Sequence, residues 1–186
     1  MEFHLYYRGK LKGNGSVQDK HDIRRYLHCQ LKVLWKQKPL TDYKKMLDRS
    51  YLPDDQPFLR NVAGHTFVPL VNEKVNLITD ISITMLRPEE PGAIVTKSGD
   101  IDNRLKTLFD ALRIPKNKSE LPNKISFSKD ETPFFCLLED DNLIANLSIK
   151  TDRLLELVES KLEVVLLIHV STKTTRPTMD YFALGI

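Results

Sequence analysis

The segment that most constrains the fold is residues 101–113, where apolar side chains recur with the period of an α-helix. They fall at positions i, i+3, i+4 and i+7: Leu105, Leu108, Phe109 and Leu112. Strand-like segments stand on either side, at residues 74–86 before the helix and at residues 134–138 and 143–150 after it. Since helices alternating with strands build α/β domains, we expect an α/β (α+β) fold with a mixed β-sheet flanked by two main helices.

The second main helix is predicted at residues 18–37, whose apolar stripe faces away from many basic side chains. Alternation predicts a strand at residues 2–8, and apolar runs predict strands at residues 65–71 and 162–170. We also expect a small strand at residues 124–128 and short helices at residues 42–47 and 152–160. Within residues 143–150, alternation places four side chains toward the core: Leu143, Ala145, Leu147 and Ile149.

A length of 186 residues suits one domain, and we assign residues 1–186 to it. The two cysteines, Cys29 and Cys136, have no CxxC spacing, so we expect reduced thiols in a cytoplasmic protein. No stretch approaches the ~20 apolar residues that cross a bilayer, and the N-terminus has no apolar core typical of a signal peptide. We therefore expect no membrane association.

Positive charge is concentrated at the start of the chain. Residues 1–50 contain twelve lysines and arginines against five acids, a balance of +7, although the whole chain carries only +3. This asymmetry is typical of a face that binds phosphate, although a solvated basic helix explains it equally well. The candidate DNA-binding residues lie in the glycine-containing loop 8–16 and the following helix: Lys10, Lys12, Asn14, Lys20, Arg24 and Arg25.

Carboxylates gather around the predicted helix at residues 101–113. Asp100 precedes it, Asp102 lies in its first turn, and Lys106 and Asp110 follow at successive turns on the same face. A second acidic pair, Asp140-Asp141, stands before a strand. Carboxylates brought close together repel one another unless a cation lies between them, and carboxylate oxygens suit Mg²⁺ or Mn²⁺.

Each of these features also has an ordinary structural explanation. An aspartate at a helix start is usually a cap, and Asp102 with Lys106 is usually a surface pair. An acidic pair such as Asp140-Asp141 is usually part of a turn. The five scattered histidines are better explained by structural or surface roles, and Trp35 by core packing rather than by stacking on a base.

The combined pattern D-I-D-N-R-L-K-x-x-x-D-A-L, followed by D-D-N-L-I and a strand, resembles the RusA family of Holliday junction resolvases. The resemblance is strong over residues 99–112 and 139–150. It implies catalytic roles for Asp100, Asp102, Lys106 and Asp141, with metal bound by the three aspartates. It also implies supporting roles for the neighbouring Asn103, Asp110 and Asp140.

The resemblance further implies the activity. We expect a metal-dependent endodeoxyribonuclease that hydrolyses phosphodiester bonds with Mg²⁺ or Mn²⁺, cleaves branched DNA such as four-way junctions, and acts as a homodimer with two active sites. Relative to the family pattern, residues 38–63 and 114–135 are expected to be insertions and residues 171–186 an extension. Two alternatives stay open: a nuclease acting on other structured DNA in phage or defence biology, or a module that binds DNA or protein without cutting.

Overall fold

The computed structural model describes residues 1–47, 57–89, 101–123, 125–176 and 184, and it has the mixed α and β content expected from the sequence. Within these ranges the elements are two α-helices, seven strands and five short 3-10 helices, three of which are capped by an Asn or Asp side chain. Their bounds are β1 Glu2–Lys10, α1 Val17–Leu34, η1 Leu40–Leu47, β2 Arg60–Val62, β3 His65–Val71, η3 Glu73–Val75, β4 Leu77–Arg87, α2 Ile101–Leu112, η4 Lys118–Glu120, η5 Lys129–Glu131, β5 Phe134–Leu138, η6 Asp141–Leu143, β6 Ile144–Arg153 and β7 Glu163–Thr174.

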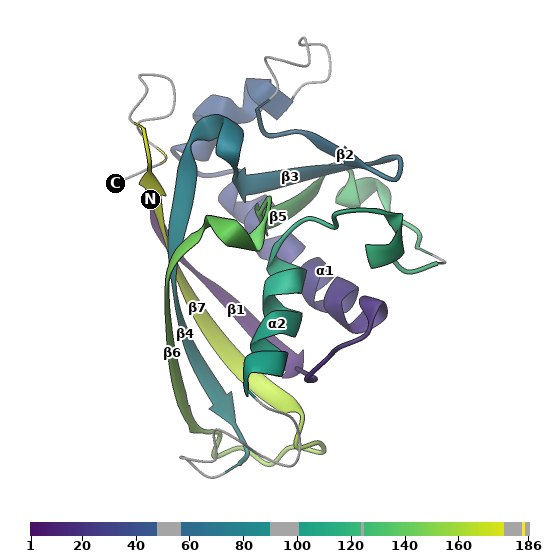
Figure 1. Cartoon of the computed structure of the whole chain (residues 1–186), viewed down its shortest axis with the longest axis vertical. Helices are drawn as coiled ribbons and strands as arrows, with labels where there is room; N and C mark the ends of the chain where they lie inside the picture. Colours follow the sequence, from purple (N-terminus) through teal and green to yellow (C-terminus); the bar gives the residue numbers. More distant parts are fainter. Residues whose placement is uncertain (48–56, 90–100, 124, 177–183, 185–186) are drawn as a thin grey trace.

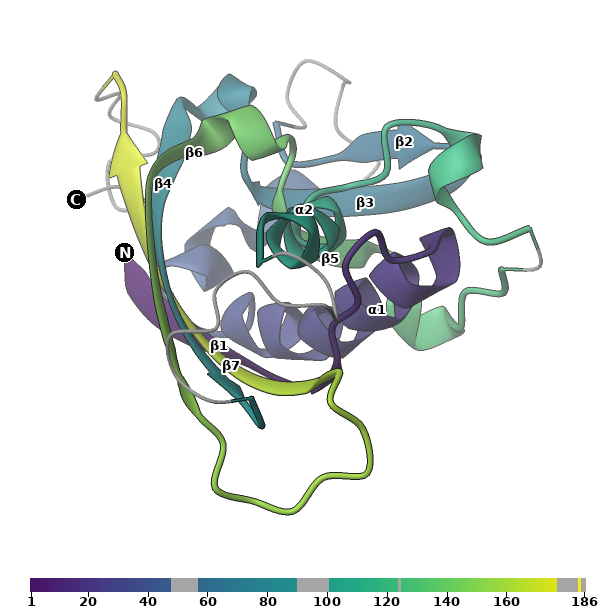
Figure 2. The same ribbon diagram turned by 60° about the horizontal axis from the view of Figure 1, so that its bottom comes forward.

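The strands form two sheets rather than the one we expected. The larger sheet has the order β1-β7-β4-β6, in which β7 pairs antiparallel with both neighbours and β4 pairs parallel with β6. The smaller sheet has the order β2-β3-β5, with β3 antiparallel to β2 and parallel to β5. The larger sheet curves around α1 and α2, and the smaller sheet lies on the other side of the helices (Figures 1 and 2).

The core lies between these layers. Alternate residues of β4, from Leu77 to Met85, point inward and are almost fully buried, and they pack with the apolar stripes of both helices. On α2 the inward side chains include Leu105, Leu108 and Leu112, as the helical period predicts. Burying one such leucine contributes roughly 1.5–3 kcal/mol. Trp35 is also buried, which confirms core packing.

Three local predictions were wrong. Residues 154–162 contain no helix, because β6 stays paired with β4 as far as Arg153 and the chain must then cross to β7 in a loop. Residues 125–128 form no strand, and residue 124 lies outside the described residues. β6 is an edge strand, so Leu147 remains 44% exposed and Ala145 is exposed, rather than both being buried.

No helix among the described residues is long and apolar enough to cross a membrane. The proposed insertion at residues 38–63 includes η1, which overlaps the short helix predicted at residues 42–47, and strand β2, which the sequence patterns did not predict. The proposed extension from residue 171 begins inside β7, which reaches Thr174.

His21 on α1 is buried in an aromatic cluster, with its ring close to those of Phe127 and Phe134. Burial, with the nearby charges of Arg24 and Arg25, lowers the pKa of His21 to about 4. The unfolded chain therefore binds this proton at a higher pH than the folded chain does. The stability that the neutral ring supplies is complete above about pH 6.5 and is lost as the pH falls toward 4.

We predict that His21→Leu reduces the loss of stability between pH 7 and pH 4 by up to about 3 kcal/mol, because this buried proton site is gone. Urea unfolding at several pH values measures the difference from the parent. His4→Leu, at an exposed position on β1, is the control and should retain the parent's pH dependence. Parallel stability curves for the parent and His21→Leu would contradict the prediction.

Candidate functional site

The exposed face of α2 carries the first half of the predicted site. Asp102 lies in the first turn and Lys106 one turn later, and both are exposed while the opposite face of the helix packs in the core. The backbone N–H of Asn103 donates to Oδ1 of Asp102 at 2.7 Å, which orients this carboxylate. Asp100, the other acid predicted here, lies outside the described residues.

Two buried arginines attach the start of α2 to the end of β4. Arg104 on α2 and Arg87 on β4 are almost fully buried, and both lie close to the carboxylate of Glu89, at 3.2 and 3.3 Å. Opposite charges in a buried setting are strongly coupled, so this group fixes where α2 begins. The position of Asp102 follows from it. Sequence reasoning missed both arginines, because arginine side chains are usually exposed and local spacing does not show that these two meet Glu89.

Asp110, in the last turn of α2, is held by two cations. Its carboxylate contacts Nζ of Lys20 at 2.8 Å and Nη2 of Arg113 at 2.7 Å. Partial burial raises the pKa of Asp110, but the hydrogen bonds from Lys20 and Arg113 outweigh burial and the pKa lies below its ordinary value. Arg113 also binds Glu120 with both terminal nitrogens. Asp110 is therefore part of an ion-pair network that joins α1, α2 and η4.

Asp140 and Asp141 differ in their surroundings. Asp140 caps η6, accepting from the N–H of Asn142 at 3.2 Å, and it pairs with Lys116 at 2.7 Å. Burial raises the pKa of Asp140, but its hydrogen bonds with Asp141 and Lys116 outweigh burial and lower it. The pKa of Asp141 is raised, mainly by its hydrogen bond to Asp140 and then by burial. A cation beside the exposed Asp141 would favour its charged form and so oppose this upward shift of the pKa.

The structure does not bring Asp102 and Asp141 together. The N–H of Ile114 donates to the carbonyl of Leu138 at 2.9 Å, so η6 lies beside the end of α2, whereas Asp102 is at its start (Figure 1). The helix axis between Asp102 and Leu112 is about 15 Å long at 1.5 Å per residue. Among the described residues, no three His, Cys, Asp or Glu side chains form a group that could hold a metal ion. The predicted three-aspartate site, which includes Asp100, stays a prediction.

The predicted DNA-binding residues have different environments. The prediction for Arg24 was wrong, because this side chain is only 2% exposed and donates to the carbonyls of Asp110 at 2.6 Å and Arg113 at 3.0 Å. Arg25 pairs with Glu131, and Lys20 pairs with Asp110. In residues 10–16, the last residue of β1 and the loop to α1, Lys10 and Asn14 are exposed, while Lys12 contacts Asp19 at 2.8 Å and keeps 45% of its side chain exposed.

That loop, residues 10–16, is packed against α2. The N–H of Gly15 donates to Oγ1 of Thr107 at 2.9 Å, and the Thr107 hydroxyl donates to the carbonyl of Asn103 at 3.2 Å. Gly15 and Thr107 were not among the predicted site residues. The glycine-rich loop was recognised in the sequence, but nothing there indicated the helix residue that it contacts.

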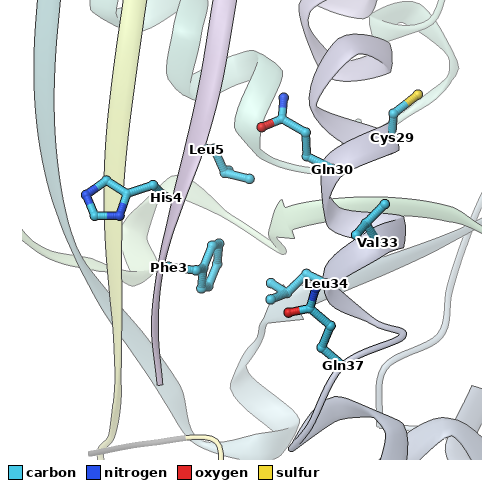
Figure 3. A pocket seen from close by; sticks show the side chains of 8 residues that line it. All are labelled: Phe3, His4, Leu5, Cys29, Gln30, Val33, Leu34 and Gln37. Carbon is cyan, nitrogen blue, oxygen red and sulfur yellow. The ribbon is translucent and has the colours of Figure 1, made fainter.

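A separate groove of about 490 Å³ lies between β1 and α1 (Figure 3). Its apolar lining includes Phe3, Leu5, Val33 and Leu34. The side chain of Gln30 bonds the outer edge of β1 there, donating to the carbonyl of Tyr6 at 2.6 Å and accepting from its N–H at 2.9 Å. The groove contains none of the predicted catalytic acids.

Comparisons with known proteins found no family model, no curated protein and no solved structure that matches this chain.

We predict that Arg24→Met destabilises the protein by about 2–3 kcal/mol, because it removes charge-assisted hydrogen bonds to the last carbonyls of α2 and leaves those carbonyls buried. Thermal and urea unfolding measure the loss. The matched control is Arg25→Met, one position along α1, where a more exposed pair with Glu131 is lost and the cost should stay below about 1 kcal/mol. Equal stabilities for the two variants would show that Arg24 does not cap α2.

Proposed function

We propose that this protein is a metal-dependent endodeoxyribonuclease that cleaves branched DNA, using the exposed start of α2 as its reactive face. The observation that carries the proposal is the arrangement of Asp102 and Lys106 on a helix whose other face is buried. A carboxylate and an ammonium one helical turn apart suit a phosphodiester, with the acid toward a cation and the amine toward the phosphate. The resemblance of residues 99–112 and 139–150 to the RusA pattern supports the same activity.

The carboxylate chemistry of the proposed site suits a hard divalent cation. Asp102 is exposed and offers carboxylate oxygens, which Mg²⁺ and Mn²⁺ prefer. When bound, such an ion would lower the pKa of a coordinated water and offset charge on the phosphate. We assign Asp102 to hold it, with Asp100 directly before the helix. The resemblance implies Asp141 as a third ligand, but η6 lies beside the other end of α2, so the role of Asp141 is tested separately from that of Asp102.

The protein's own residues would each have a separate role in binding and cleavage. Asp102, held by the N–H of Asn103, keeps its carboxylate oriented at the start of α2. Lys106 places a positive charge beside the phosphate, where negative charge increases in the transition state. Lys10 and Lys12 in the adjacent loop suit the flanking phosphates. The homodimer proposed with this activity would supply two such faces for symmetric cleavage of a four-way junction.

A second candidate is a module that binds branched DNA without cutting it. This candidate is favoured because η6, which begins at Asp141, lies beside the end of α2, whereas Asp102 is at its start. Purified protein incubated with labelled four-way junction, duplex and single-stranded DNA, with Mg²⁺, Mn²⁺ or EDTA, separates the two functions. Cleavage that requires the metal supports the nuclease. Junction binding without cleavage in any metal supports the second candidate.

For the acids, we predict that Asp102→Asn abolishes cleavage while folding and junction binding persist, because an exposed ligand charge is lost and no core contact changes. Single-turnover cleavage and a gel-shift assay measure the two properties. Asp42→Asn on the distant η1 is the control and should cleave at the parent's rate. Asp141→Asn is tested beside them. If it cleaves normally while Asp102→Asn does not, the metal is held at the start of α2 alone.

For the lysine, we predict that Lys106→Ala lowers the cleavage rate by about 10²–10³, the usual cost of losing a charge that stabilises the transition state. The melting temperature should barely change, since a surface pair contributes less than about 1 kcal/mol. Lys106→Arg should restore activity only in part, because a planar guanidinium does not reproduce a compact ammonium. Lys45→Ala, exposed on η1, serves as the control. Cleavage by Lys106→Ala at the parent's rate would leave Lys106 as an ordinary surface residue.

A further inference from the structure

Residues 10–16, the last residue of β1 and the loop to α1, are anchored at several points. The N–H of Leu11 donates to the carbonyl of Leu162 at 2.9 Å, and Lys12 contacts Asp19 in the first turn of α1 at 2.8 Å. Ser16 and Asp19 form a reciprocal capping box at the start of α1. These contacts fix both ends of the loop while Lys10 and Asn14 stay exposed.

The contact with α2 is unusually close. Gly15 is buried, its N–H donates to Oγ1 of Thr107 at 2.9 Å, and a Cβ added to Gly15 would lie 2.6 Å from Cγ2 of Thr107. That separation is shorter than the normal distance between nonbonded carbon atoms. A side chain at position 15 would therefore push the loop away from α2.

The same hydroxyl connects the loop to the proposed reactive face. Thr107 donates to the carbonyl of Asn103, and the N–H of Asn103 donates to the carboxylate of Asp102. A chain of three hydrogen bonds thus runs from Gly15 to Asp102. Since Thr107 is buried, it cannot touch DNA directly.

We infer that Thr107 is a positioning residue, which holds the cationic loop 10–16 beside Asp102 and Lys106 so that both bind neighbouring phosphates of one DNA strand. This inference rests on the proposed nuclease function and adds to it how the binding face is assembled. Its signature is weaker DNA binding with little change in the chemical step, because Thr107 positions the loop and takes no part in the reaction.

The first experiment compares Thr107→Val with Thr107→Ser. Valine keeps the shape of threonine but leaves the N–H of Gly15 without its acceptor, whereas serine keeps the hydroxyl. We expect Thr107→Val to raise the Kd for a fluorescent four-way junction in EDTA about tenfold, the equivalent of one buried hydrogen bond. It should raise KM similarly and leave kcat within about twofold. Thr107→Ser should match the parent in all three.

The second experiment uses suppression. Gly15→Ala should weaken junction binding about as much as Thr107→Val, because the new methyl group meets Cγ2 of Thr107. Thr107→Ser removes that Cγ2, so the double variant Gly15→Ala/Thr107→Ser should bind more tightly than Gly15→Ala alone. Melting curves for all variants establish that each is folded at the assay temperature.

The outcomes separate the inference from the proposed function. A parent protein that neither binds nor cleaves the junction overturns the proposed function. If the parent binds but Thr107→Val has the parent's Kd, the positioning role is wrong while the nuclease proposal stands. A double variant as weak as Gly15→Ala also overturns the positioning role, and restored binding supports it.

Discussion

The packing of the two helices depends on the hydrogen bonds that the guanidinium of Arg24 donates. A helix ends with carbonyl groups that have no partner within the helix, and Arg24 of α1 binds two carbonyls at the end of α2. Burial of this charge lowers the pKa of Arg24, so its hydrogen bonds must offset a large desolvation cost. With the end of α2 fixed by Arg24 and its start fixed by Arg104, every side chain on the exposed face has a defined place.

The main elements could be predicted because their periodicity reflects burial. α2 and β4 each bury one face, so apolar residues recur at the helical or strand period, and both elements occur where expected. The helix predicted at residues 152–160 is absent for a physical reason. Their leucines have a helix-like spacing, but Leu155 and Leu157 are 90% and 101% exposed in a loop that no other layer covers. β2 is three residues long and too short to show a period.

The candidate site could be predicted only in part. The face with Asp102 and Lys106 follows from the helical period, because both residues and the buried stripe belong to one element. The partners of Asp110 and Asp140 come from α1 and from the turn after α2. The spacing of residues along the chain does not predict contacts between residues that are far apart in the sequence. Arg24 was predicted at the surface but is buried, again because of a contact that is distant in the sequence. Its position among basic residues suggested a surface role, while its depth in the fold depends on α2, which lies far along the chain.

The side chain of Gln30 also affects how the molecule meets others of its kind. An edge strand presents unpaired N–H and carbonyl groups that can template a strand from another chain. On β1 the primary amide of Gln30 occupies both groups of Tyr6, as a neighbouring strand would. An incoming strand would have to displace this amide before it could add along the middle of β1. One glutamine on a helix therefore hinders edge-to-edge aggregation along β1.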